Sequence, residues 1–227
     1  MASPLSSATM TDCQKCQRRR RPSLVPGLCI VCFRRIEFEK LPPEQQRDRF
    51  SALVHARYVD AEIEDLPGSL GSQLVNSPDT ESIYLWGPPG TGKTYAFAAM
   101  AKRYVRMGFN VQRETWERLC LRIRDTFNPR ATETEWGIVE PYLRADKLIL
   151  EDIGTTVSTG RQETDFAVRV LLLILDSRNE DCLQTLITGN KPVNELERSF
   201  DARIASRLRQ GTIIAKTGRD RRASDRG

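Results

Sequence analysis

The hydrophobic pattern from about residue 82 onward alternates between short apolar runs and longer amphipathic stretches. The short runs are typical of buried strands, and the longer stretches repeat apolar residues at helical spacing. The expected strands are 82–86, 110–114, 147–151, 183–188 and 212–216. The expected helices are 91–107, 115–127, 133–143, 163–178 and 201–209. This alternation favours an α/β fold in which helices cover both faces of a parallel sheet.

The first 80 residues follow a different pattern. Residues 43–58 predict a helix that begins at the Pro42-Pro43 pair, and residues 66–80 are rich in turn formers and are interpreted as a linker. Four of the six cysteines lie before residue 33. We therefore expect three parts: a small cysteine module at 1–40, a helical linker at 41–80 and an α/β core at 81–227.

The composition indicates where the protein is located and what charge its partners carry. The 227 residues are 39% hydrophobic, which is enough for one domain and a small module. The sequence has no run of about 18 apolar residues, and its first residues lack the pattern of a secretory signal. We expect a cytoplasmic protein with no membrane partner. The net charge of +5, concentrated in "KCQRRRR" and "KTGRDRR", favours a polyanionic partner.

The segment "GPPGTGKT", Gly87 to Thr94, fits the phosphate-loop pattern and lies between an expected strand and an expected helix. Its glycines let backbone N–H groups turn toward phosphate oxygens, and the following helix adds its positive end. Lys93 would neutralise the outer phosphates, and the Thr94 hydroxyl would bind Mg²⁺. The segment therefore predicts a nucleoside triphosphate site. The expected nucleotide-binding residues are Gly87, Pro88, Pro89, Gly90, Thr91, Gly92, Lys93, Thr94 and Tyr95.

Polar residues end the next two buried strands. In "KLILEDIG", Glu151 is expected to support Mg²⁺ and Asp152 to polarise the attacking water. In "LITGN", Thr188 and Asn190 end the following strand. The Asn190 amide would contact the outer phosphate or orient the water, unless it only forms the turn.

Cys13, Cys16, Cys29 and Cys32 form two C-x-x-C pairs twelve residues apart. This spacing predicts a closed, structural four-thiolate zinc site, and disulfides are the weaker interpretation in a cytosolic chain. The arginines between and after the pairs would dock a protein partner or contact a phosphate backbone, or would simply be solvated.

Two tryptophans, Trp116 and Trp136, lie on the helices after the second core strand. They could stack on DNA bases, although core packing is the favoured interpretation.

The motifs together resemble the AAA+ ATPases, and within them the DnaC/IstB-type helicase loaders and transposition helpers. The resemblance runs from about Ala56 to Arg222 and rests on "GPPGTGKT", "LILEDIG", "LITGN" and "FDARIASRL". It implies a five-stranded AAA+ core and ATP as the ligand. "HARYVDAEIEDLP" is similar to the segment that lies close to the adenine in this family.

"DARIASRLRQG" resembles the family segment that carries the arginine finger. The resemblance implies that Arg207, with Arg203 one turn earlier, reaches the site of a neighbouring subunit, so that copies assemble into an open ring or spiral. It also makes Arg221 a candidate phosphate sensor, and we expect a core without a separate helical lid, as in the short form of the family. The catalytic residues that it implies are Lys93, Glu151, Asp152, Asn190, Arg203 and Arg207.

One departure concerns the acids. The family usually has Asp where this chain has Glu151, and the next acid is Asp152. Small displacements at such a site slow the chemistry, so we expect ATP binding with slow hydrolysis.

The resulting hypothesis is an ATP-dependent replicative helicase loader of bacterial or phage type, which uses ATP, Mg²⁺ and Zn²⁺. It would bind single-stranded DNA with its core and the helicase with its cysteine module. The alternatives are an IstB-like transposition helper and an adaptor that binds ATP without hydrolysing it.

Overall fold

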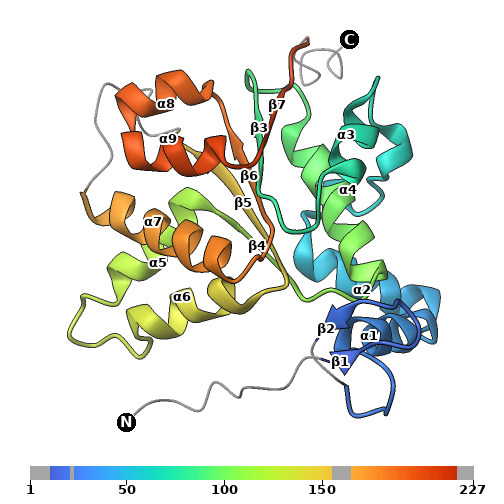
Figure 1. Ribbon diagram of the computed structural model, residues 1–227. Coiled ribbons are helices and arrows are strands. Elements are labelled where there is room, and N and C mark those ends of the chain that lie inside the picture. The colour runs from blue at the N-terminus through green and yellow to red at the C-terminus, as the bar shows by residue number, and fades with distance from the viewer. Residues whose placement is uncertain (1–10, 21–22, 155–164, 219–227) are drawn as a thin grey trace.

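A computed structural model describes residues 11–20, 23–154 and 165–218. Its main sheet contains β3 (Ile83–Trp86), β4 (Val111–Thr115), β5 (Lys147–Ile153), β6 (Thr185–Gly189) and β7 (Thr212–Ala215). The strands are all parallel and lie in the order β4-β5-β6-β3-β7 (Figure 1). The five expected strands and the parallel α/β fold are therefore confirmed, with ends that differ by one or two residues.

Helices cover both faces of this sheet (Figure 1). One face carries α4 (Lys93–Arg106), together with α1 (Ile30–Glu39), α2 (Pro43–Leu53) and α3 (Leu70–Asn76). The other face carries α5 (Trp116–Asp125), α6 (Glu135–Arg144), α7 (Asp165–Glu180), α8 (Val193–Ser199) and α9 (Ala202–Arg209). Side chains alternate between these two cores along each strand, as the pleat requires: Ile83 and Leu85 enter the first core and Tyr84 the second.

For the elements that lie outside the sheet, some of the predictions from the sequence were wrong. The expected helix 43–58 ends at Leu53, because the β-branched Val54 is extended and buried, and a separate short 3₁₀ turn, η1, covers Ala56–Tyr58. A second turn, η2, covers Ile63–Asp65. The turn-rich stretch 66–80 contains α3, whose Leu70 and Leu74 are buried. Helices α1 and α8 were not expected.

The cysteine module lies at the amino ends of the core strands (Figure 1). It consists of the short hairpin β1 (Thr11–Asp12) and β2 (Arg19–Arg20) followed by α1. Its buried cysteines and Phe38 belong to the same hydrophobic core as α4. Gly108, just after α4, packs closely against α1: a Cβ there would lie 2.2 Å from the Val31 carbonyl oxygen.

Within the described residues, no helix is both long and apolar enough to cross a bilayer.

Candidate nucleotide site

The phosphate loop links the end of β3 to the start of α4. Gly90 and Gly92 have φ of 77° and 93°, a region that glycine enters without strain, and Gly92 caps α4 at its amino end. Thr91 is buried and its hydroxyl donates to the Pro88 carbonyl oxygen at 2.9 Å, which fixes the turn. Pro88 and Pro89 are exposed. Gly87 packs against β7 so closely that a Cβ would lie 2.0 Å from the Lys216 carbonyl oxygen.

Lys93, the first residue of α4, joins this loop to the end of β6. Its ammonium group donates to the carbonyl oxygens of Gly87 at 2.7 Å and Pro88 at 3.0 Å, and to Asn190 Oδ1 at 2.9 Å. Lys93 and Asn190, which were each expected at the outer phosphate, are thus brought into direct contact by two strands that lie side by side.

Glu151 lies in the same place, at the end of β5. The Thr94 hydroxyl interacts with its carboxylate and lowers its pKa, so the expected magnesium-binding pair also lies together. Glu151 is 1% exposed, and Arg113 Nε of β4 donates to its Oε1 at 2.5 Å. Burial raises the pKa of Glu151, whereas the charge and hydrogen bond of Arg113 and the Thr94 hydroxyl oppose that rise. Sequence reasoning missed Arg113.

Asp152 occupies an irregular position in β5. Its φ is 61°, and the register between β5 and β6 shifts between Leu150 and Ile153. The Asp152 N–H donates to the hydroxyl of the fully buried Thr188 at 2.9 Å. This bulge turns the partly exposed Asp152 away from the regular alternation of the strand, beside the buried Glu151.

These residues fit a magnesium–triphosphate group by their chemistry. A glycine loop in the left-handed conformation and the amino end of α4 suit phosphate oxygens. The hydroxyl of Thr94 and the carboxylate of Glu151 are ligand types that Mg²⁺ prefers. Lys93 and Asn190 would bind the outer phosphate.

The segment expected near the adenine packs beside the start of α4. Tyr95 donates from its hydroxyl to Asp65 Oδ2 at 2.9 Å and meets the Tyr58 ring edge-on, with 6.3 Å between ring centroids. Farther along α4, Glu62 accepts hydrogen bonds from Lys102 at 2.8 Å and from Arg106 at 2.6 Å.

The two arginines of the expected finger segment lie on α9. Arg203 is exposed and pairs with Asp201 at 3.1 Å, and the partly exposed Arg207 pairs with Asp176 of α7. In this single chain they are therefore held by their own carboxylates. Arg221 lies outside the described residues.

The four expected zinc ligands converge. The sulfur atoms of Cys13, Cys16, Cys29 and Cys32 all lie within 4.8 Å of one another, and all four are free thiols. The Cys16 and Cys29 sulfurs are 3.8 Å apart, the separation of roughly 3.8 Å expected for thiolates 2.3 Å from one tetrahedral zinc ion. N–H groups of Cys16 and Cys29 lower the pKa of the Cys13 thiol to about 6. The cluster could hold zinc.

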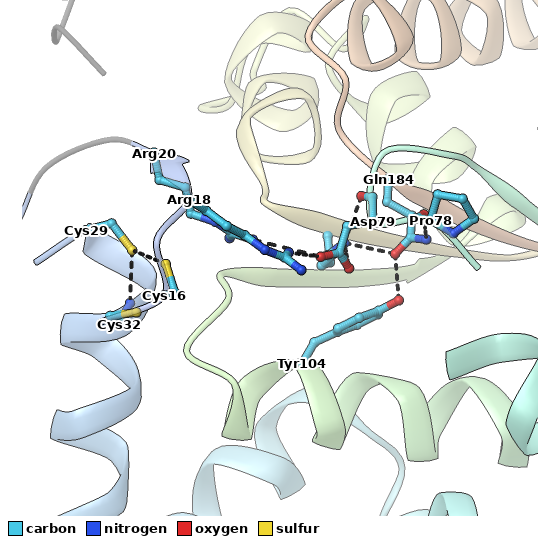
Figure 2. Close-up of polar contacts among 10 residues, drawn as sticks. Cys16, Arg18, Arg20, Cys29, Cys32, Pro78, Asp79, Tyr104 and Gln184 are labelled. Atoms are coloured by element: carbon cyan, nitrogen blue, oxygen red, sulfur yellow. Dashed lines mark hydrogen bonds and ion pairs between the residues drawn. The ribbon is translucent and has the colours of Figure 1, made fainter. Parts of the chain in front are cut away.

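A polar network joins the cysteine module to the core, as Figure 2 shows. Arg18 pairs with Asp79 at 2.6 Å, and Asp79 also pairs with the buried Lys147 at 3.3 Å. Gln184 accepts from Lys147 at 2.9 Å and from the Tyr104 hydroxyl at 2.6 Å. On α1, Arg34 pairs with Asp146 at 2.9 Å.

The two tryptophans between β4 and β5 differ in exposure. Trp116 is 2% exposed and belongs to the second core, so base stacking there is excluded and core packing is correct. Trp136 is 56% exposed.

Comparisons with known proteins agree with this geometry. The family described as IstB-like ATP binding protein matches residues 63–210. The replicative helicase loader DnaC of Escherichia coli K12 is 25% identical over 166 residues, which cover 73% of this chain and 60% of that protein. This chain therefore matches less than two thirds of the length of its curated relatives.

Solved structures share the fold. The crystal structure of DnaI has a TM-score of 0.56 and 21% identity, covering 80% of this chain and 94% of that one. The crystal structure of the DnaC helicase loader has a TM-score of 0.59 and 16% identity, covering 71% of this chain and 99% of that one. The family match extends over more than half of the sequence and contains the phosphate loop, both acids and the arginine segment. The chain therefore belongs to the IstB/DnaC-like family of AAA+ ATP-binding proteins.

Proposed function

We propose that this chain is a cytoplasmic, ATP-dependent replicative helicase loader that binds single-stranded DNA, assembles with copies of itself and hydrolyses ATP slowly to ADP and phosphate. The observation that carries the proposal is the separation of two sites at opposite ends of one sheet. The nucleotide-site residues lie at the carboxyl ends of β3, β5 and β6, whereas the cysteine module packs at the amino ends. A partner held by the module would leave the nucleotide site open to a neighbouring subunit.

Each nucleotide-site residue has a role in this proposal. Lys93 and Asn190, already in contact, would bind the outer phosphate, and Thr94 and Glu151 would hold Mg²⁺. Bound Mg²⁺ would neutralise charge on the phosphates. Asp152, displaced by the bulge, would orient the attacking water.

Assembly would complete the site. Arg207 of one copy would leave Asp176 and reach the phosphates bound by its neighbour, with Arg203 beside it. Exposed positive charge on α9 supports this role, because an arginine finger must be supplied from a surface.

The cysteine module supplies a surface for the helicase. The turn between β2 and α1 places Leu24 at 94% exposure and Val25 at 40%. A backbone hydrogen bond from Ser23 to Leu28 and another from Leu28 to Val25 hold this turn in shape. An apolar tip on a preformed turn suits a protein partner, because little ordering is needed on binding.

DNA contact is assigned to the α5–α6 region. Trp136 and Phe127 are exposed there, and Arg118 is 74% exposed on α5. Exposed aromatic rings beside arginines suit the bases and phosphates of a single strand.

The test is native mass spectrometry of the full chain with the replicative helicase of its host or phage, in ATP and in ADP. We expect a complex that loosens in ADP and that the double variant Leu24→Ser, Val25→Ser loses. Leu173→Ser, a 44% exposed leucine on α7, is the matched control and should keep the complex. No complex in either nucleotide would contradict the loader.

The family description and the shared core support a second candidate, an IstB-like transposition helper. A complex with a transposase and none with a helicase would select it. A non-hydrolysing adaptor is distinguished by phosphate release with single-stranded DNA present. A rate no higher than that of Lys93→Ala would favour the adaptor. Under the loader proposal, Glu151→Asp should speed release if the longer acid slows hydrolysis.

A further inference from the structure

An arginine inside β4 reaches the carboxylate of the nucleotide site. Arg113 pairs in register with Ile149, two residues before Glu151 on the neighbouring strand. Because side chains alternate along strands, Arg113, Ile149 and Glu151 share the face that α4 covers. The ion pair therefore crosses diagonally between two parallel strands, under the start of α4.

The Glu151 carboxylate is held by an ion pair. Arg113 Nε donates to Oε1 at 2.5 Å, and the Thr94 hydroxyl near the same carboxylate lowers its pKa. Both partners of the ion pair are shielded, with side-chain exposures of 10% for Arg113 and 2% for Glu151. Arg113 Nη1 also donates to the Leu53 carbonyl oxygen at the end of α2, at 3.4 Å, which fixes the guanidinium itself.

This ion pair restrains a side chain that is longer than the aspartate usual at this position in the family. Glutamate places its carboxylate about 1.5 Å farther from the backbone than aspartate and has one more rotatable bond. An unrestrained glutamate would lose rotamer freedom whenever it bound a metal, whereas one already clamped by a buried arginine has lost it on folding. A threonine hydroxyl that points its O–H at a carboxylate keeps its oxygen lone pairs for a metal, so Thr94 beside Glu151 suits a shared Mg²⁺.

We propose that Arg113 is a positioning residue that fixes the carboxylate of the longer acid Glu151 and thereby sets the Mg²⁺ affinity of the nucleotide site. The inference rests on the proposed ATP and Mg²⁺ site. Arg113 would act on the metal through Glu151, with which it forms the ion pair. Removal of such an outer partner of a metal ligand costs about 10- to 100-fold in metal affinity.

The test separates metal affinity from nucleotide affinity. Binding of a fluorescent ATP analogue to the full chain is measured across a Mg²⁺ titration and again in EDTA. We expect Arg113→Met to raise the half-saturating Mg²⁺ concentration about tenfold and to leave the EDTA affinity unchanged. Arg113→Lys, which keeps the charge, should recover part of the loss.

Three further variants exclude a purely structural effect. Glu151→Gln should raise the Mg²⁺ requirement by itself, and Arg113→Met added to it should raise it no further, because the two residues act as one unit. Arg144→Met is the matched control, since Arg144 pairs with Glu140 at 2.6 Å on α6. It should bind Mg²⁺ like the unaltered chain.

Several results would overturn the inference. An unchanged Mg²⁺ requirement in Arg113→Met, or an equal loss of affinity in EDTA, would remove the positioning role. Should Arg113→Met fail to fold, Arg113→Lys decides: a wild-type Mg²⁺ requirement with the EDTA affinity also unchanged overturns the inference, and a raised one supports it. An unaltered chain that binds the analogue with no dependence on Mg²⁺ overturns it as well. An unaltered chain that does not bind the analogue at all refutes the proposed function too.

Discussion

The Glu62 ion-pair cluster ties the segment before β3 to α4, and Glu62→Gln removes its charge at constant shape. Glu62 accepts from Arg106 at 2.6 Å and from Lys102 at 2.8 Å, and the Lys102 side chain is only 3% exposed. The hydrogen bond from Arg106, followed by that from Lys102, lowers the pKa of Glu62 from 4.5 to about 2. The substitution therefore leaves a buried ammonium group without its carboxylate.

The size of the effect follows from that pKa. A value near 2 in place of 4.5 corresponds to about 3 kcal/mol of folding free energy. Glu62 is 33% exposed, so solvent screening reduces this to about 1.5 kcal/mol. Because the folded-state pKa is lowered, this stability is fully present above pH 4.5. It is lost as the pH falls from 4.5 toward 2.

Urea unfolding of the two chains between pH 7 and pH 3 measures the effect. We expect Glu62→Gln to be less stable by about 1.5 kcal/mol at pH 7 and the difference to shrink as the pH approaches 3. Loss of metal from cysteine ligands at low pH affects both chains and cancels in the difference. Asp60→Asn is the control, because the Asp60 side chain is 75% exposed in its pair with Arg47 and should contribute less than about 0.5 kcal/mol. A difference that does not change with pH would refute the reasoning.

Two other predictions concern the cysteine module. A chelator that strips metal from the four cysteines should lower the melting temperature of the whole chain in calorimetry, because the module shares a core with α4. A separate transition at lower temperature, with the melting temperature of the main transition unchanged, would contradict this. Gly108→Ala should cost at least about 2 kcal/mol, since φ is +86° and the Cβ would lie 2.2 Å from the Val31 carbonyl oxygen and 2.5 Å from the Arg35 nitrogen. Limited proteolysis should then cut within residues 23–40 while the affinity for triphosphate persists, and unchanged resistance would show that α1 tolerates the methyl group.

The core strands could be predicted because their apolar runs are continuous, as burial on both faces requires. Helix α8 could not, since "VNELERS" is short and polar and forms where Pro192 starts a turn after β6. Helix α1 begins between Cys29 and Cys32. The spacing of these cysteines indicates a tight turn around a metal and therefore does not predict a helix there.

The residues of the nucleotide site also fall into those that the sequence could predict and those that it could not. The phosphate loop and the acid pair have fixed spacings next to strands, so the chain order alone predicts that they meet. Arg113 lies in "NVQRE", an ordinary strand pattern, and its role depends on the register between β4 and β5. The sequence offered one signal for this role: Arg113 alternates with Val111 and Thr115, which places it on the strand face that α4 covers.

The contacts between the cysteine module and the core have a mechanical consequence. Asp79, which holds Arg18, lies just before β3, and Asp146, which holds Arg34, immediately precedes β5. The opposite ends of those two strands carry the phosphate loop and the acid pair. A partner that pulls on the module therefore loads β3 and β5 lengthwise, over about 13 Å for the four residues of β3. When a strand is pulled along its axis, all of its hydrogen bonds to the neighbouring strands resist together. Such a pull would therefore reach the nucleotide site as tension along β3 and β5, and would not break the hydrogen bonds one at a time from the edge of the sheet.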